Sequence, residues 1–360
     1  MRNSRLISYA EALREALDLK MASDPRVFLM GEGVADPKAI FGTTGGLAEK
    51  YGHDRVIEMP VAEAGLTGVA IGAALMGQRP VMTHQRVDFT LLALDQLANN
   101  AAKLRYVFGG RFSVPLVVRA IIGRGWGQSA QHAQSLETIF AHFPGLKVVM
   151  PVTAHDAKGM LISAIEDDNP VMFLEHRWLH GAVGEVPEGE YRVPLAGPRV
   201  AQSGKDITIV ATSLMVVEAL HAAKGLAAAG VSAEVVDLRV LRPLDLAPIV
   251  ESVRRTGRLL AVDTGWKHYG TGAEIVAGVA EHCHGALKAA PRRVSVADHP
   301  APSARSLIEN YYPDSWAVAD AAAGILGLSG EKIAAMKATL GPRNGGLPLD
   351  VPDPSFKGPF

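Results

Sequence analysis

The stretch "LKVVMPVTAHDAKGMLISAIEDDNPVMFLEH", residues 146–176, decides the fold because it holds two strand patterns around one helix pattern. Residues 146–152 and 170–176 are short, nearly continuous apolar runs, which are typical of parallel strands buried on both faces. Between them, apolar side chains recur with the spacing of one helical face, at Ala157, Met160, Leu161, Ala164 and Ile165. A strand, a helix and a second strand in this order predict a parallel βαβ unit.

The same alternation extends in both directions from this stretch. Toward the N-terminus, strand-like runs occur at 26–34, 79–84 and 114–123. Toward the C-terminus, strand-like runs at 206–213, 232–241, 258–264 and 292–298 alternate with helix patterns near 215–229, 245–255 and 272–284. The sequence therefore predicts an α/β protein of two doubly wound domains.

Pro- and Gly-rich segments set the expected boundaries of these domains. We expect a first domain over 1–185, an extended linker over 186–204, a second domain over 205–340 and an irregular tail over 341–360. The N-terminal 24 residues are typical of an amphipathic helix, with Ser8 as its N-cap.

Composition excludes several classes of function. The chain has 360 residues and a net charge of −1, so nothing in its charge indicates binding to nucleic acid or to an anionic membrane. Its longest mostly apolar run, 66–76, is about half of the roughly 20 residues that a membrane span needs. Cys283 is the single cysteine, and no signal peptide is visible at the N-terminus, so we expect a cytoplasmic protein without a disulfide.

A carboxylate stands at the head of an apolar stretch, "EMPVAEAGLTGVAIGAALMGQRPVMTH", residues 58–84. Gly65, Gly68 and Gly72 lie in its predicted helix, where each glycine costs about 1 kcal/mol relative to alanine. Such a helix suits a buried position in a core or a subunit interface. Glu63, at its N-terminal edge, is either solvated and favourable for the helix dipole, or a buried carboxyl with a raised pKa that contacts a ligand.

A polar loop follows the strand predicted near residues 114–123. It reads "GRGWGQSAQH", residues 123–132, and Ser135 then precedes a helix pattern. Loops at the carboxyl ends of parallel strands are where open α/β sheets bind ligands, so His132 is a candidate acid, base or hydrogen-bond donor. The alternative is an ordinary surface histidine.

Several motifs, in order and at family spacing, carry a resemblance. They are "VFLMGEGV" at 27–34, the run from Gly42 to Val81, "LDQLANNAAKLRYVFGG" at 94–110, "VPLVVRA" at 114–120, the run from Gln131 to Glu175, "VDLRVLRPLD" at 236–245 and "GTGAEI" at 270–275. Together they resemble the beta subunit of thiamine-diphosphate-dependent 2-oxo acid dehydrogenases, the decarboxylating component of pyruvate, branched-chain and acetoin dehydrogenases. The resemblance runs from about residue 5 to 325.

The resemblance implies a thiamine pyrimidine-binding domain followed by a transketolase C-terminal domain. It implies that Glu63 hydrogen-bonds the aminopyrimidine ring of thiamine diphosphate, with Val61, Gln85 and Phe89 beside that ring. His132 matches the active-site histidine of the family, which assists the acyl intermediate and its transfer. The implied reaction is decarboxylation of a small 2-oxo acid, with transfer of the acyl group to a lipoyl carrier.

The resemblance also implies partners and ions. The chain lacks the GDG…N pattern that holds Mg²⁺ and diphosphate, so Mg²⁺ is expected mainly on an alpha subunit, in an α2β2 heterotetramer that can join a lipoyl acyltransferase core. The chain alone should then be inactive. An optional potassium site of the family, built mostly from main-chain oxygens, matches Leu116, Ala164, Ile165, Asp167 and Asn169.

Two regions depart from the family pattern. "VMTHQRVDF", residues 81–89, has Thr83 for glutamate and Arg86 for a hydrophobic residue. The loop before His132 carries large polar and aromatic side chains where the family pattern is richer in glycine. Arg86, Arg124, Trp126 and Gln131 are therefore candidates for the substrate pocket, where arginine suits a carboxylate or phosphate; a salt bridge to the partner subunit is the alternative. These departures also leave open a carboligase or transketolase-like synthase that forms a carbon–carbon bond, or a non-catalytic subunit.

Overall fold

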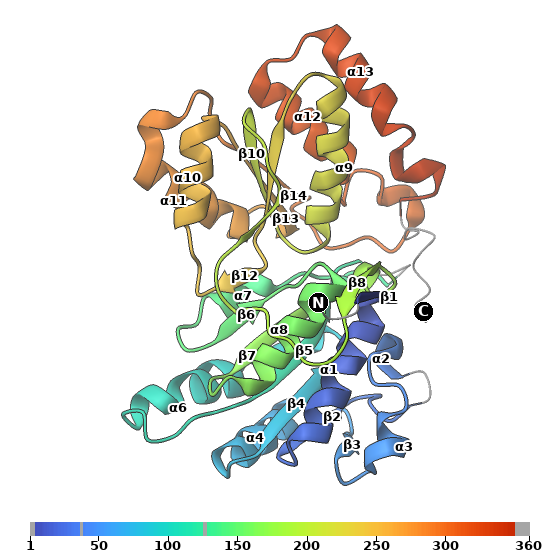
Figure 1. Cartoon of the computed structure of the whole chain (residues 1–360), viewed down its shortest axis with the longest axis vertical. Coiled ribbons are helices and arrows are strands. Elements are labelled where there is room, and N and C mark those ends of the chain that lie inside the picture. The colour runs from blue at the N-terminus through green and yellow to red at the C-terminus, as the bar shows by residue number, and fades with distance from the viewer. Residues whose placement is uncertain (1–3, 37–38, 125–127, 350–360) are drawn as a thin grey trace. The chain divides into compact units, whose positions relative to one another are not determined.

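The computed structural model describes residues 4–36, 39–124 and 128–349, which form two compact α/β units (Figure 1). The first unit contains residues up to Arg124 together with Ile139–Leu195, and the second contains residues 128–138 and the chain from Ala196 onward. The expected fold class, two α/β domains, is confirmed. The expected first domain, 1–185, differs in two respects: residues 128–138 within it belong by their contacts to the second unit, and the first unit continues to Leu195.

The sheet of the first unit is parallel, with the strand order β6-β7-β5-β4-β2-β3. Its strands are β2 (Val27–Gly31), β3 (Val56–Glu58), β4 (Arg79–His84), β5 (Val117–Ile122), β6 (Lys147–Val149) and β7 (Val171–His176). All residues of β5 and β7 are buried, as their continuous apolar runs predict. Because the strands are parallel, their carboxyl ends meet at one edge.

Helices α1 (Tyr9–Ser23) and α8 (Ala154–Glu166) pack against each other (Figure 1). The Ser8 side chain accepts a hydrogen bond from the Glu11 amide, and the Glu11 carboxylate accepts one from the Ser8 amide, which confirms Ser8 as the N-cap. A short antiparallel pair, β1 (Ser4–Ser8) with β8 (Val183–Pro187), was not predicted. The remaining helices of this unit are α2 (Ala39–Gly42), α3 (Leu47–Tyr51), α4 (Glu63–Leu75), α5 (Val87–Thr90) and α6 (Ala102–Val107).

Helix α4 is less buried than its all-round apolar sequence predicts. Thr67, Ala70 and Ile71 are buried against the unit, but Val69 is 59% exposed and Met76, just after the helix, is 83% exposed. A side chain at Gly65 or Gly72 would meet no atom of the described chain within 4 Å. These glycines therefore do not serve a close approach of backbones within this chain.

The second unit has the strand order β14-β13-β10-β11-β9, in which β9 alone is antiparallel to its neighbour. The strands of this sheet are β9 (Arg199–Gln202), β10 (Ile207–Ala211), β11 (Ala233–Asp237), β13 (Leu259–Trp266) and β14 (Arg292–Val296), and the unit also contains β12 (Val240–Arg242), which lies outside this sheet. Its helices are α9 (Leu214–Ala228), α10 (Ala247–Thr256), α11 (Thr271–Cys283), α12 (Ser315–Leu326) and α13 (Gly330–Leu340), and α7 (Glu137–Ala141) begins in it. The segment 186–204, expected to be an extended linker, thus contributes β9 to this sheet.

Among the helices of the described residues, none combines the length and the apolar character that crossing a membrane requires.

Candidate active site

The carboxyl edge of the first sheet collects polar side chains from three neighbouring strands. Glu32 follows β2 directly, Glu63 opens α4 after β3, and Gln85 follows β4. Strand β2 lies between β3 and β4 in the sheet, so the three connections leave the sheet side by side. Ligands of open α/β sheets bind at this edge, outside the carboxyl ends of the strands.

Glu63 is buried, with 2% of its surface exposed, although it is the first residue of α4. The solvated alternative for this carboxylate is therefore wrong. The carboxylate also lies in the first helical turn, where the helix dipole stabilises negative charge.

The carboxyl group of Glu32 faces that of Glu63, and this residue was not singled out from the sequence. The pKa of Glu32 is raised to about 7, chiefly by burial and then by the negative charge of Glu63, a hydrogen bond with Glu63 and the charge of Glu58. The nearby negative charge therefore favours the protonated form of Glu32. The available sequence signal was a glutamate directly after a buried strand, in "LMGEG".

Glycines and Glu58 hold the loop that carries Glu32. A side chain at Gly31 would lie 2.5 Å from the Thr83 carbonyl oxygen, so only glycine lets β2 and β4 approach as they do. The Glu58 carboxylate accepts hydrogen bonds from the amides of Gly33 and Ala35, the latter at 3.0 Å. The side chain of Glu58, the last residue of β3, therefore fixes the loop after β2.

The other residues expected beside the aminopyrimidine ring lie at the same edge. Gln85 donates from Nε2 to the Glu32 carbonyl oxygen at 3.4 Å, which joins the loops after β4 and β2. Phe89 lies half-buried in α5, and Val61, between β3 and α4, is 80% exposed. The structure thus brings Val61, Glu63, Gln85 and Phe89 together at one sheet edge.

Arginines and aromatic rings occupy the continuation of this edge, after β4, β5 and β7. The Arg86 and Arg177 guanidinium carbons lie 5.6 and 5.3 Å from the centre of the Phe41 ring, and that of Arg124 lies 3.7 Å from the Trp178 ring. Arg124 is 7% exposed. Trp126, the other expected pocket residue of this loop, lies outside the described residues.

The expected histidine lies on the segment that belongs to the second unit. His132 is half-buried and Gln131 is exposed. The same segment ends in the buried carboxyl of Glu137, whose pKa is raised well above its ordinary value by burial and by the charge of Asp263. Asp263 accepts hydrogen bonds from the Thr212 hydroxyl and from the amides of Gly265 and Gly272. The second unit therefore holds a buried carboxyl pair of its own.

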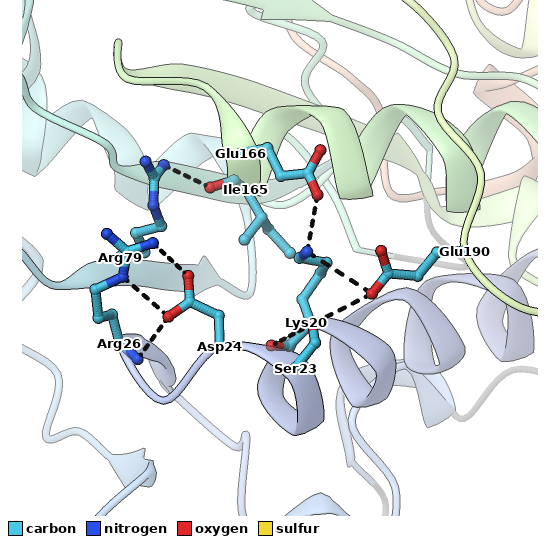
Figure 2. A pocket seen from close by; sticks show the side chains of 8 residues that line it. All are labelled: Lys20, Ser23, Asp24, Arg26, Arg79, Ile165, Glu166 and Glu190. Atoms are coloured by element: carbon cyan, nitrogen blue, oxygen red, sulfur yellow. Dashed lines mark hydrogen bonds and ion pairs between the residues drawn. The ribbon is translucent and has the colours of Figure 1, made fainter.

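The five residues expected to bind potassium lie near the opposite, amino-terminal edge of the sheet, where a cation of the protein already reaches two of them. Arg79 Nη1 donates to the carbonyl oxygens of Ile165 at 3.0 Å and Asp167 at 3.1 Å (Figure 2 shows the first contact). The carboxylate of Asp167 pairs with Lys147 and accepts from Asn169. A potassium ion would have to compete with the Arg79 guanidinium for these oxygens, so the set does not fit an open potassium site.

A polar cavity of about 460 Å³ lies beside Arg79 (Figure 2). Lys20, which is 7% exposed, pairs there with Glu166 and Glu190, and Arg26 pairs with Asp24. These pairs neutralise one another and tie α1 to α8. We therefore interpret the cavity as a structural feature between paired side chains, and not as a ligand site.

Comparison with known proteins assigns both units. Residues 5–181 match the family model described as transketolase, pyrimidine binding domain, and residues 198–318 match that of transketolase, C-terminal domain. The beta subunit of acetoin:2,6-dichlorophenolindophenol oxidoreductase from Cupriavidus necator is 43% identical over 89% of this chain and 97% of its own. The beta subunit of 2-oxoisovalerate dehydrogenase from Bacillus subtilis is 41% identical over 85% of this chain and 94% of its own.

Two further proteins extend the comparison. The pyruvate dehydrogenase E1 component subunit beta of Rickettsia bellii is 40% identical over 88% of this chain and 97% of its own. A solved structure described as a split gene transketolase, inactive beta4 tetramer, is similar with a TM-score of 0.72 at 26% identity, over 89% of this chain and 99% of that one.

Proposed function

Since the chain belongs to the family of beta subunits of thiamine-dependent 2-oxo acid dehydrogenases, we propose that it supplies the pyrimidine-binding half of an active site that decarboxylates a small 2-oxo acid. The observation that carries this proposal is the pair of the partly buried Glu32 and the buried Glu63 at the carboxyl edge of the first sheet. It lies within the residues that match the pyrimidine-binding domain.

The residues at this edge fit the aminopyrimidine ring of thiamine diphosphate. Glu32 Oε1 is buried and has no hydrogen-bond partner among the described residues, so the pair can still accept a polar ligand. Glu63 would hydrogen-bond a ring nitrogen, with Val61, Gln85 and Phe89 beside the ring. When bound, the cofactor supplies the electron sink that decarboxylation needs, while the protein supplies orientation and electrostatics.

The two carboxyl groups can hold and move a proton at this position. With its pKa raised to about 7, Glu32 holds a proton at neutral pH far more readily than an ordinary carboxyl group does. Glu32 would keep a proton available to the Glu63 carboxyl, which in turn shares it with the ligand nitrogen. General acid–base assistance of this kind typically contributes about 10²- to 10⁴-fold in rate.

The active site needs a second chain in this proposal. The sequence lacks the GDG…N pattern for Mg²⁺ and diphosphate, so an alpha subunit would hold most of that group in an α2β2 heterotetramer. The exposed apolar face of α4, with Val69 and Met76, suits burial by such a partner. The beta4 tetramer of the split gene transketolase is described as inactive, which agrees with a beta chain that needs its partner.

We further propose that His132 assists transfer of the acyl group to a lipoyl carrier of an acyltransferase core, and that the enzyme works in the cytoplasm. The polar segment that carries His132 supports the first point, and the single cysteine supports the second. The main candidate for the substrate is a small 2-oxo acid.

The experiment is to co-purify the chain with its alpha subunit and to supply thiamine diphosphate, Mg²⁺ and a lipoyl domain. We expect CO₂ release from at least one 2-oxo acid and acylation of the lipoyl group, and neither from the chain alone. Absence of CO₂ release from every 2-oxo acid would contradict the proposal and favour a non-catalytic subunit.

A second candidate function rests on the similarity to the split gene transketolase. In that case the activated carbon would add to an aldehyde or ketone, and the enzyme would form a carbon–carbon bond. The same holoenzyme, given a 2-oxo acid and an aldehyde without a lipoyl domain, separates the two. A new hydroxyketone formed faster than lipoyl acylation would favour the synthase.

A further inference from the structure

The segment that carries His132 belongs to the second unit, and we call residues 128–138 the histidine segment. Residues 128–136 form no helix or strand, so their position depends on the side chains that contact the rest of the unit. Two side chains that follow His132 are buried, because Ala133 and Glu137 are 6% and 0% exposed. The histidine segment is therefore held on the unit just after the histidine.

The residue directly after His132 packs into a hydrophobic cluster of the second unit. Ala133 is buried together with Val296 and Tyr311, and Trp266 packs against the same cluster. Val296 ends β14 and Trp266 ends β13, so the cluster lies at the carboxyl ends of two adjacent parallel strands. This contact holds the segment but gives it no direction, because apolar contacts have no preferred orientation.

The buried pair of Glu137 and Asp263 supplies a directional contact. Asp263, in β13, is 1% exposed and accepts a hydrogen bond from the Thr212 hydroxyl at 3.1 Å. The amides of Gly265 and Gly272 each donate to it at 3.3 Å. Three donors suit an ionised carboxylate, which can only accept hydrogen bonds.

Glu137 is the donor of this pair. It is fully buried, and neither of its carboxyl oxygens accepts a hydrogen bond from another described residue. An ionised carboxylate at this position would be costly, whereas a protonated one can donate to Asp263. The pKa of Glu137 is accordingly raised well above its ordinary value, chiefly by burial and then by the charge of Asp263, and a hydrogen bond with Asp263 is a further cause.

Close packing limits how the histidine segment can shift along this contact. A side chain at Gly265 would lie 2.7 Å from Glu137 Oε1 and 3.3 Å from the Ser135 carbonyl oxygen. The segment and β13 therefore approach each other as closely as glycine permits. Ala133 and Glu137 hold the segment one and five positions after His132.

We propose that Glu137 is a positioning residue: as the hydrogen-bond donor of a buried acid pair, it fixes the histidine segment on the second unit and so sets the position of His132 for acyl transfer. The inference rests on the proposed role of His132 and adds a residue that acts through it. Because Glu137 is fully buried, it acts through the backbone of the segment. The alternative, in which the pair only stabilises the fold, is an outcome of the test.

The test uses the heterotetramer with thiamine diphosphate and Mg²⁺, supplied with pyruvate or with 3-methyl-2-oxobutanoate. Two rates are measured on each sample: acylation of a lipoyl domain, and reduction of an artificial electron acceptor, which needs decarboxylation but no lipoyl group. Glu137→Met keeps the approximate size and removes the donor. It should lower the ratio of lipoyl acylation to acceptor reduction about tenfold or more, the range of one hydrogen bond to a charged group.

A conservative variant and a matched control assign this loss to the donor. Glu137→Gln keeps a neutral hydrogen-bond donor, so it should restore the ratio to within about threefold of the wild type. Glu234→Met is the control, because Glu234 is a 3% exposed glutamate of the same unit that pairs with Arg255 at 2.6 Å. It should leave the ratio unchanged.

Hydrogen exchange of the same heterotetramers tests the anchoring without reference to activity. The amides of residues 128–136 should exchange about tenfold faster or more in Glu137→Met than in the wild type, because the segment loses its directional contact. Exchange of these amides should not change in Glu234→Met. If Glu137→Met fails to assemble, Asp263→Asn weakens the same hydrogen bond from the acceptor side, since a neutral acceptor makes a bond about half as strong, and it should change both measurements in the same direction.

A double variant shows whether Glu137 acts through His132. In a His132→Ala background, Glu137→Met should lower lipoyl acylation by less than about twofold further, because a positioning residue has no effect once the residue that it positions is gone.

The outcomes separate the inference from the function on which it rests. Independent losses from the two substitutions, an equal loss in Glu137→Gln and Glu137→Met, or unchanged exchange in Glu137→Met would each overturn the inference and leave the proposed decarboxylation standing. Full lipoyl acylation by His132→Ala would refute the role of His132 and the inference together. Failure of the wild type to decarboxylate any 2-oxo acid would refute the proposed function, and the exchange measurement would still decide whether Glu137 anchors the segment.

Discussion

The carboxyl groups of Glu32 and Glu63 face each other at the carboxyl edge of the first sheet, where the charge of Glu63 and a hydrogen bond with it help to raise the pKa of Glu32. They come from two different connections, one after β2 and one after β3, and the parallel pairing of these strands brings them together. Glu63 is 2% exposed. Two neighbouring carboxylates repel each other unless one is protonated, and groups with such shifted pKa values are frequent at functional sites.

The raised pKa of Glu32 predicts how the stability of the isolated chain depends on pH. A carboxyl group binds more protons folded than unfolded between its ordinary pKa of 4.5 and its raised pKa of about 7. Stability should therefore fall as pH rises through this window. Glu32→Gln should reduce the fall by an amount on the order of 1 kcal/mol, because solvent screens part of the interaction. Urea unfolding of the wild type and the variant at about pH 5 and pH 8 measures this difference in unfolding free energy. The same dependence on pH in both proteins would contradict the pairing of Glu32 with Glu63.

The buried Glu137–Asp263 pair of the second unit gives a second prediction about how stability depends on pH. The pKa of Glu137 is raised well above its ordinary value, chiefly by burial and then by Asp263. Its contribution to stability should be present below about pH 4.5 and be lost as pH rises. Glu137→Gln keeps the shape and a hydrogen-bond donor, so its unfolding free energy should fall less between about pH 5 and pH 8 than that of the wild type.

Glu49→Gln serves as the control for Glu137, because Glu49 lies on the partly exposed helix α3 of the first unit. It should follow the wild-type dependence on pH. If Glu137→Gln instead lost stability relative to the wild type at pH 8, the two carboxyl groups would not repel each other in the folded protein.

Because of Arg79, potassium should have little effect on the thermal stability of the protein. Its guanidinium donates to the carbonyl oxygens of Ile165 and Asp167, two of the five residues expected to bind the ion. Exchange of Na⁺ for K⁺ at about 0.1 M should shift the Tm of the wild type by less than about 1 °C. In Arg79→Met the freed oxygens should make K⁺ stabilising relative to Na⁺. A K⁺-specific rise of several degrees in the wild type would show that the ion displaces Arg79.

Much of the fold could be predicted because its strands are long apolar runs between clear helix patterns. Strands β2, β4, β5, β7, β10 and β13 fall where the sequence places them. The elements that were missed are short or lie at sheet edges: β1, β3, β8 and β9 have three to five residues each and lack a continuous apolar run. Such strands depend on their pairing partners, which local sequence does not reveal.

The site was predictable in part, for reasons that differ between residues. Glu63 stands out because a carboxylate heads an apolar helix, and the structure confirms that it is buried, while its contact with a ligand stays a prediction. Glu32 was missed because nothing local marks it, and its raised pKa depends on a neighbour 31 positions away in the sequence. The burial of α4 was overestimated because an apolar sequence does not say whether the covering surface belongs to the same chain.

The most direct measurement of the central claim is the rate of CO₂ release by the heterotetramer carrying Glu63→Gln, with thiamine diphosphate binding and subunit assembly measured on the same sample. Glutamine keeps the size of the side chain and removes its exchangeable carboxyl proton. We predict a fall in kcat of about 10²-fold or more, with the alpha partner still bound. Turnover within about threefold of the wild type, in an intact heterotetramer, would contradict the claim that this carboxyl group serves the reaction.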